Sequence, residues 1–286
     1  MQSDQEAFYD KPMKQQKHPH FEHRGAKLYR KNNEFSEKKF QRVRRVSRKS
    51  KLVHSFQRIG KCLNEENVAN IPTDNLSKVC LILINNYEHD KHDPKIGAMN
   101  DGYLIGLYHH RLGFKVFYLY NCESSKYPEC LEFFLKYTLG QLTVFYSGRD
   151  TIKNGSHGIE FKDNSISCNE FGRLIADNYN GRCKAVFISD CTSGGSVFDI
   201  KTVQNSSAPS KVLSFYVNKT TDPDSKEGRR SHGIFTYYWC KILYECPNIT
   251  PKRLNERMDA SVKRFNENFV CECTDPNLEN QPIFKD

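Results

Sequence analysis

From Lys78 onward, short apolar runs alternate with longer segments in which apolar residues recur every three or four positions. The short runs have the length of β-strands, and the longer segments have the period of amphipathic helices. Strands are expected at residues 78–86, 115–121, 142–148, 184–190 and 211–218, and helices at 96–113, 127–140, 168–179, 231–245 and 250–268. This alternation predicts an α/β domain whose central sheet is mainly parallel and is flanked by helices.

A smaller feature lies between the third and fourth expected strands, in the segment GSHGIEFKDNSIS. Polar residues at 162–164 are expected to form a tight turn in the middle of this segment. The pattern therefore predicts a short hairpin inserted between two strands of the main sheet.

The first quarter of the chain has a different pattern, because residues 1 to about 50 are polar and contain few aliphatic side chains. Such a segment buries too little apolar surface to offset the entropy of ordering, so we expect it to be disordered or weakly helical. A short helix is expected at 55–70, and residues 71–77 are expected to form a linker. The prediction is an extension over 1–77 and a domain over 78–286.

Charge is distributed as unevenly as hydrophobicity. Residues 1–77 hold 17 Lys and Arg against 9 Asp and Glu, whereas 78–286 hold 26 against 25, so the net charge of +9 lies almost entirely in the extension. The run FQRVRRVSRKSKLV is a candidate contact for nucleic acid, for an acidic membrane face or for another acidic partner such as a nuclear import receptor. A solvated tail is the alternative.

The compartment follows from the absence of targeting signals in the sequence. No run of 18 apolar residues is present, and the first 20 residues lack the apolar core of a secretory signal, so a cytoplasmic or nuclear protein is expected. Eleven irregularly spaced cysteines then indicate reduced thiols rather than disulfides. Cys271 and Cys273 lack a second pair at zinc-like spacing, so no metal site is predicted.

A thiol stands at the carboxyl end of one expected strand, where open α/β sheets gather their ligands and chemistry. The strand KAVFISD leads directly into Cys191, which is followed by Thr-Ser-Gly-Gly-Ser. Cys191 is the candidate nucleophile, and the small residues Ser193 and Gly194 are candidates for stabilising an oxyanion through the local backbone amides. The alternative is a buried structural cysteine followed by an ordinary turn.

Five blocks follow one another along the chain: GAMNDGYLIGLYHHRLGF, LTVFYSG, VFISDCTSGGS, SHGIFTYYWCKIL and the closing segment from TPKRLNERMD to QPIF. In this order they resemble blocks of the metacaspases, a family of caspase-like cysteine peptidases. The resemblance covers about residues 78–286. It implies a caspase-fold three-layer sandwich, with Cys191 as the nucleophile that attacks a peptide bond.

One departure from the family pattern concerns the catalytic base. After Phe-Tyr-Ser-Gly, metacaspases carry His-Gly, whereas this chain carries Arg149 and Asp150. Arginine stays protonated and cannot act as a base, although its charge near Cys191 would favour the thiolate. His157, eight residues after Arg149, is the remaining candidate base, and the alternative makes it a residue of the hairpin turn.

The resemblance also implies a preference for Arg or Lys before the scissile bond, because acidic residues line the family's pocket. Asp101 matches one of those positions and would receive a basic side chain, unless it only caps or solvates its helix. Metacaspases often carry a second Asp two residues before the thiol, where this chain has Ser189. Asp190 is the other candidate, although side-chain alternation along a strand turns it to the opposite face.

Two functional classes are therefore expected. The first is a cysteine endopeptidase acting through Cys191 and His157 on polypeptide substrates. The second is a pseudopeptidase that retains the fold and binds peptides or regulates a partner, with the basic extension as a localisation element. A legumain-like relative is disfavoured because its secretory targeting is absent. The resemblance implies a monomer that requires no cofactor, with calcium dependence left open.

Overall fold

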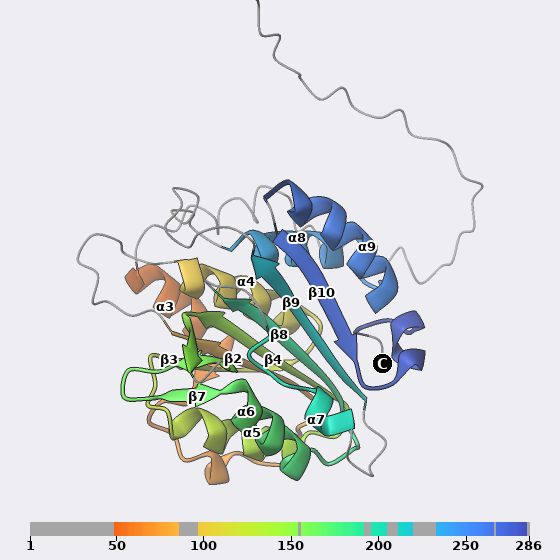
Figure 1. The fold of residues 1–286 in the computed structure, drawn as a ribbon. Coiled ribbons are helices and arrows are strands. Elements are labelled where there is room, and N and C mark those ends of the chain that lie inside the picture. The colour runs from red at the N-terminus through yellow and green to blue at the C-terminus, as the bar shows by residue number, and fades with distance from the viewer. Residues whose placement is uncertain are drawn as a thin grey trace, which may run out of the picture. The chain divides into compact units, whose positions relative to one another are not determined.

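Seven strands form the central sheet of the computed structural model, in the order β1-β3-β2-β4-β8-β9-β10 (Figure 1). Their bounds are Gly60–Cys62 (β1), Lys78–Ile84 (β2), Lys115–Tyr120 (β3), Gln141–Gly148 (β4), Lys184–Cys191 (β8), Val212–Lys219 (β9) and Glu267–Cys273 (β10). Neighbouring strands run parallel, except that β10 is antiparallel to β9. The prediction of a mainly parallel sheet is confirmed.

The structure describes residues 49–85, 97–153, 156–191, 196–204, 211–219, 233–265 and 267–284. All of them belong to one compact unit. The predictions for residues 1–48, including most of the basic run, fall outside the described residues and stay predictions.

Helices cover both faces of the sheet and complete a three-layer arrangement (Figure 1). The α-helices are α3 (Lys49–Gln57), α4 (Gly97–Arg111), α5 (Lys126–Tyr137), α6 (Cys168–Asn178), α7 (Lys201–Gln204), α8 (Ile234–Glu245) and α9 (Pro251–Val262), and short 3-10 helices are η1 (Val68–Asn70), η3 (Lys263–Phe265) and η4 (Pro276–Asn280). On one face α4 packs against β2, β4 and α8, and α3 and α9 extend this layer. On the other face α5 packs against β2 and α6.

The central strands are mostly apolar because both of their faces are buried, as is usual in a parallel sheet. Along β2, Leu81 and Leu83 belong to the core shared with α5 and α6. Ile82 and Ile84 point to the opposite face, where α4 approaches so closely that a Cβ on Gly102 would lie 2.7 Å from the Ile84 side chain. Gly102 therefore sets the distance between α4 and the sheet.

A second, three-stranded antiparallel sheet contains β5 (Asp150–Lys153), β6 (Ser156–Glu160) and β7 (Ser165–Ser167). The pair β6 and β7 confirms the predicted hairpin. Strand β5 was not predicted, because its four residues are mostly polar and pair only across the small sheet. A capping box between Ser167 and Glu170 then starts α6 directly after β7.

Residues 49–77 contain more secondary structure than the extension and linker expected there, namely α3, β1 and η1. Helix α3 ends at Gln57 rather than continuing to 70, and β1 adds an edge strand beside β3. Leu52, Phe56 and Leu63 are fully or almost fully buried. A three-residue strand has too little periodicity to be recognised in sequence, and its partner lies more than 50 residues away.

The predicted end of the last helix was also wrong. The helix expected at 250–268 ends at Val262. After η3, β10 pairs with β9 along seven residues, from Glu267 opposite Lys219 to Cys273 opposite Leu213. The sequence ENFVCEC carries Glu267 and Glu272 near its two ends, as edge strands often carry charges, and these residues obscure the apolar pattern of a strand.

Candidate active site

The carboxyl ends of β2, β4 and β8 meet at one edge of the main sheet. Ile84 pairs with Ser147, and Gly148 pairs with Cys191. Cys191 is the last residue of β8, so the strand delivers its thiol to the edge that the sequence indicated. Ser193 and Gly194 lie outside the described residues, and their proposed role at an oxyanion stays a prediction.

Cys191 is only 2% exposed and packs in the core on the side of α5 and α6. Ser189 lies two residues earlier and therefore on the same face of β8. Its hydroxyl is buried and has no hydrogen-bond partner within the described part of the chain. The thiol is therefore buried at the end of β8, on the same face of the strand as the Ser189 hydroxyl.

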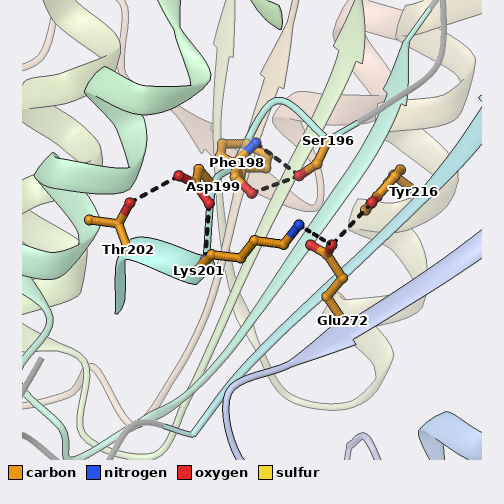
Figure 2. A network of polar contacts seen from close by, with 7 residues as sticks. All are labelled: Ser196, Phe198, Asp199, Lys201, Thr202, Tyr216 and Glu272. Carbon is orange, nitrogen blue, oxygen red and sulfur yellow. Dashed lines mark hydrogen bonds and ion pairs between the residues drawn. The ribbon is translucent and has the colours of Figure 1, made fainter. Parts of the chain in front are cut away.

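After Cys191 the described residues resume at Ser196, and a set of short-range hydrogen bonds fixes the segment from Ser196 to Thr202 (Figure 2). The Phe198 amide donates to Ser196 Oγ at 3.2 Å, and Ser196 Oγ donates to the Phe198 carbonyl at 2.6 Å. Asp199 accepts from the Lys201 amide at 3.0 Å and from the Thr202 hydroxyl at 2.9 Å. Asp199 therefore caps the start of α7.

The same segment is joined to the far strands of the sheet through Glu272 on β10 (Figure 2). Lys201 Nζ lies 3.6 Å from Glu272 Oε1, and the Tyr216 hydroxyl donates to that oxygen at 3.2 Å. Burial, together with the charge of Glu272, raises the pKa of Tyr216, so the phenol stays protonated and remains a donor. Lys201 at the start of α7 is thereby tied to β9 and β10.

Arg149 directly follows β4, which ends at Gly148. Its carbonyl accepts hydrogen bonds from the Tyr146 hydroxyl and from the Glu160 amide. The backbone at this position is therefore fixed from both sheets, since Tyr146 belongs to β4 and Glu160 to β6. An arginine side chain supplies positive charge and cannot act as a base.

His157, the other candidate base, lies within β6 of the predicted hairpin, so it is a strand residue and not the turn residue that the sequence alternative described. Its ring nitrogen Nδ1 lies 3.5 Å from Asp150 Oδ2. The Asp150 side chain is 1% exposed and the His157 side chain 39% exposed, so the pair spans from the interior to the surface. Sequence reasoning treated Asp150 only as a departure from the family pattern.

Asp101 and Asp190 come together on the face opposite Cys191, where both contact the start of α8. The Gly233 amide donates to both oxygens of Asp101, and the Ser147 hydroxyl lies 3.4 Å from Asp101 Oδ2. Asp190 Oδ2 accepts from the Thr236 amide at 3.2 Å and from the Thr236 hydroxyl at 2.7 Å. Two acids at a helix N-terminus are favoured by the exposed amides and the helix dipole.

This arrangement is tight. A Cβ on Gly233 would fall well inside van der Waals contact with the Asp190 carboxylate. Asp101 and Asp190 are 3% and 6% exposed, and their charges, after burial itself, raise the pKa of the Cys240 thiol on α8. The sequence did not identify Ser147, Gly233 or Thr236 as partners, although the block SHGIFT contains the last two at a recognisable helix start.

Among the described residues, no group of three His, Cys, Asp or Glu side chains could hold a metal ion. Cys271 and Cys273 lie two residues apart on β10, and the Cys273 thiol donates weakly to Glu279 at 3.7 Å. None of the helices in the described ranges is long and apolar enough to cross a membrane.

No protein-family model matches the chain, and no curated protein matches it. Its structure is similar to the crystal structure of the Drosophila initiator caspase Dronc, with a TM-score of 0.52 and 13% identity over 68% of this chain and 79% of the caspase. It is also similar to a structural-genomics protein from Geobacter sulfurreducens, with a TM-score of 0.51 and 15% identity over 72% of this chain and 98% of that protein. Identities this low show fold alone, and the chain has a caspase-like fold.

Proposed function

We propose that the protein is a cysteine endopeptidase of the metacaspase type, which hydrolyses peptide bonds through the Cys191 thiol. One observation carries this proposal: Gly148 pairs with Cys191, so the thiol lies at the edge from which the chain leads, through Arg149 and Asp150, to His157. A nucleophile and a candidate base thus belong to adjoining elements at the carboxyl edge of a parallel sheet.

In the proposed reaction His157 takes the proton of the Cys191 thiol, and the sulfur attacks the carbonyl carbon of the peptide bond. The resulting oxyanion is stabilised by backbone amides near Ser193 and Gly194. Collapse breaks the carbon–nitrogen bond, and the imidazolium of His157 gives its proton to the leaving amine. Water then hydrolyses the thioester, which restores the thiol.

For specificity we propose cleavage after Arg or Lys, with Asp101 as the acidic residue of the pocket and Asp190 beside it. Both carboxylates lie on the α4 and α8 side of the sheet edge and are already used by the amides of α8. A carboxylate has about four lone-pair positions, so it accepts more than one donor. Asp101→Asn is expected to reduce cleavage after Arg more than cleavage after an uncharged residue.

The proposal is tested with fluorogenic peptides that end in Arg, Lys or Asp, assayed with and without calcium, alongside an Arg-based electrophilic thiol probe. Turnover is expected to be lost in Cys191→Ala and retained in Cys62→Ala, since Cys62 is an exposed thiol far along the sheet on β1. Mass spectrometry should locate the probe on Cys191. Absence of both turnover and Cys191-selective labelling in every condition contradicts the enzyme.

A second candidate, a caspase-fold pseudopeptidase that binds peptides, is favoured by two specific observations. Arg149 stands in the position of the usual base, and the Cys191 side chain is almost fully buried. Under this alternative, the same Arg- and Lys-containing peptides bind without cleavage, and Cys191→Ala leaves their affinity unchanged. Isothermal titration with uncleavable peptide analogues distinguishes it from the enzyme.

A further inference from the structure

The hairpin formed by β5 and β6 places Asp150 and His157 on one face. Asp150 pairs with Ile159, and Ile152 pairs with His157. Because side chains alternate along each strand and directly paired residues share a face, all four of these side chains point the same way. Asp150 and His157 are diagonal neighbours on that face, which agrees with the 3.5 Å between Nδ1 and Oδ2.

Burial on this face increases steadily toward the main sheet. Ile152, near the tip of the hairpin, is 62% exposed, whereas Ile159 is fully buried in the core that also contains Cys191. Asp150 pairs with Ile159 and, like it, is buried. The His157 side chain is 39% exposed, which is intermediate between Ile159 and Ile152. The carboxylate is therefore on the interior side of the imidazole, and the ring extends from it toward the solvent-accessible edge.

The connection to the thiol is short. Neighbouring strands lie about 4.8 Å apart, which is the separation of Gly148 from Cys191. Asp150 is two residues beyond Gly148, and two residues span at most about 7 Å. The Cα atoms of Asp150 and Cys191 are thus within about 12 Å of each other, so Asp150 belongs to the same edge of the sheet as the candidate nucleophile.

We propose that Asp150 is a positioning residue for His157, resting on the proposed function in which His157 is the base. A carboxylate facing Nδ1 stabilises the neutral tautomer that carries its proton there, which leaves the lone pair of Nε2 to accept the thiol proton. When Nε2 takes that proton, the Asp150 carboxylate stays ionised and stabilises the imidazolium. At 3.5 Å the two atoms are in ion-pair contact rather than hydrogen-bonded, so the positioning role requires that this separation shorten when substrate binds.

Asp150 replaces the glycine that follows the histidine in the resembling family, so this chain carries two linked differences. Arg149 removes the base from its usual position, and Asp150 supplies an orienting carboxylate for a histidine seven residues later. A buried carboxylate is costly unless it has partners, and at 3.5 Å the imidazole of His157 is within ion-pair range of Asp150. In this chain the candidate base is therefore His157 on β6, rather than the residue that directly follows β4.

The first test needs no activity. The imidazole nitrogen-15 chemical shifts of uniformly labelled full-length protein in alkaline buffer identify the tautomer, and loss of one signal set in His157→Gln assigns the ring. We expect the proton on Nδ1 in the wild type and its transfer to Nε2 in Asp150→Asn. Asp177→Asn, which changes an exposed carboxylate on α6, should leave the spectrum of His157 unchanged.

The second test uses turnover. Asp150→Asn should lower kcat by about 10²- to 10⁴-fold, the range typical of general-base catalysis, with KM changed less than about threefold. Asp150→Glu should recover part of the loss. A wild-type proton on Nε2, or an Asp150→Asn spectrum identical to wild type, overturns the inference, and the assigned wild-type spectrum decides even if the Asp150 variants do not fold. If the tautomer changes while no peptide is cleaved, the positioning role stands and the proposed peptidase fails.

Discussion

The Gly233 amide donates to both carboxylate oxygens of Asp101, at 2.9 Å and 3.0 Å, across 132 residues of sequence. Asp101 lies in the first half of α4, and Gly233 is the N-cap of α8. Asp190, from the end of β8, completes the arrangement through Thr236. Two buried acids thus hold the start of one helix against the edge of the sheet, one residue away from Cys191.

Replacing Asp101 by Asn should destabilise the fold by about 1–3 kcal/mol, because an amide group would replace one of the two acceptors that face the Gly233 amide. Urea unfolding followed by circular dichroism measures the change in midpoint. Asp177→Asn is the matched control, since Asp177 is exposed. Equal midpoints for the two variants would show that Asp101 does not anchor α8.

Gly233→Ala should cost about 1–3 kcal/mol because the new methyl group overlaps the Asp190 carboxylate. The double variant Gly233→Ala, Asp190→Ala tests the cause directly. Removing the carboxylate relieves the overlap, so the double variant should be less destabilised than the sum of the two single variants. Additive effects would place the strain elsewhere.

Stability should fall with acidity because of His109. This residue is fully buried among the rings of Tyr108, Phe114 and Phe284, and burial lowers its pKa to about 4. Its Nδ1 donates to the Ile105 carbonyl at 2.8 Å, and Nε2 has no hydrogen-bond partner within the described ranges. The neutral ring is thus the form that the folded state accommodates.

The direction of the pH effect follows from proton uptake. Between about pH 6.5 and pH 4 the unfolded chain binds a proton at His109 that the folded chain does not, so stability is fully present above pH 6.5 and declines as the pH falls to about 4. The contribution is about 3 kcal/mol over this window. Urea midpoints at several pH values should decline less steeply for His109→Gln than for His110→Gln, whose side chain is exposed.

Thiol labelling should separate the cysteines by depth. Cys80 and Cys240 are buried, and burial raises the pKa of both thiols, so little reactive thiolate is present. Native protein treated with iodoacetamide should be modified at the exposed Cys62 long before these two, as measured by peptide mass spectrometry. All three should react at similar rates in urea. Fast native labelling of Cys240 would mean that α8 opens readily.

The sequence alone determined the main elements of the domain. Strands β2, β4 and β8 were predicted within one or two residues, because a parallel strand buried on both faces is a continuous apolar run that needs no partner to be recognised. It also identified Cys191 as the residue at the end of β8, since that depends only on where the apolar run stops.

Tertiary structure decided everything that depends on pairing between distant segments. The contact of Asp150 with His157 follows from the register of β5 and β6, and the capping of α8 by Asp101 and Asp190 follows from packing across the sheet edge. Strands β1 and β10 likewise exist through their neighbours. Local patterns record which residues are buried, whereas register and packing select which polar groups meet, and that selection is made only when the whole sheet assembles.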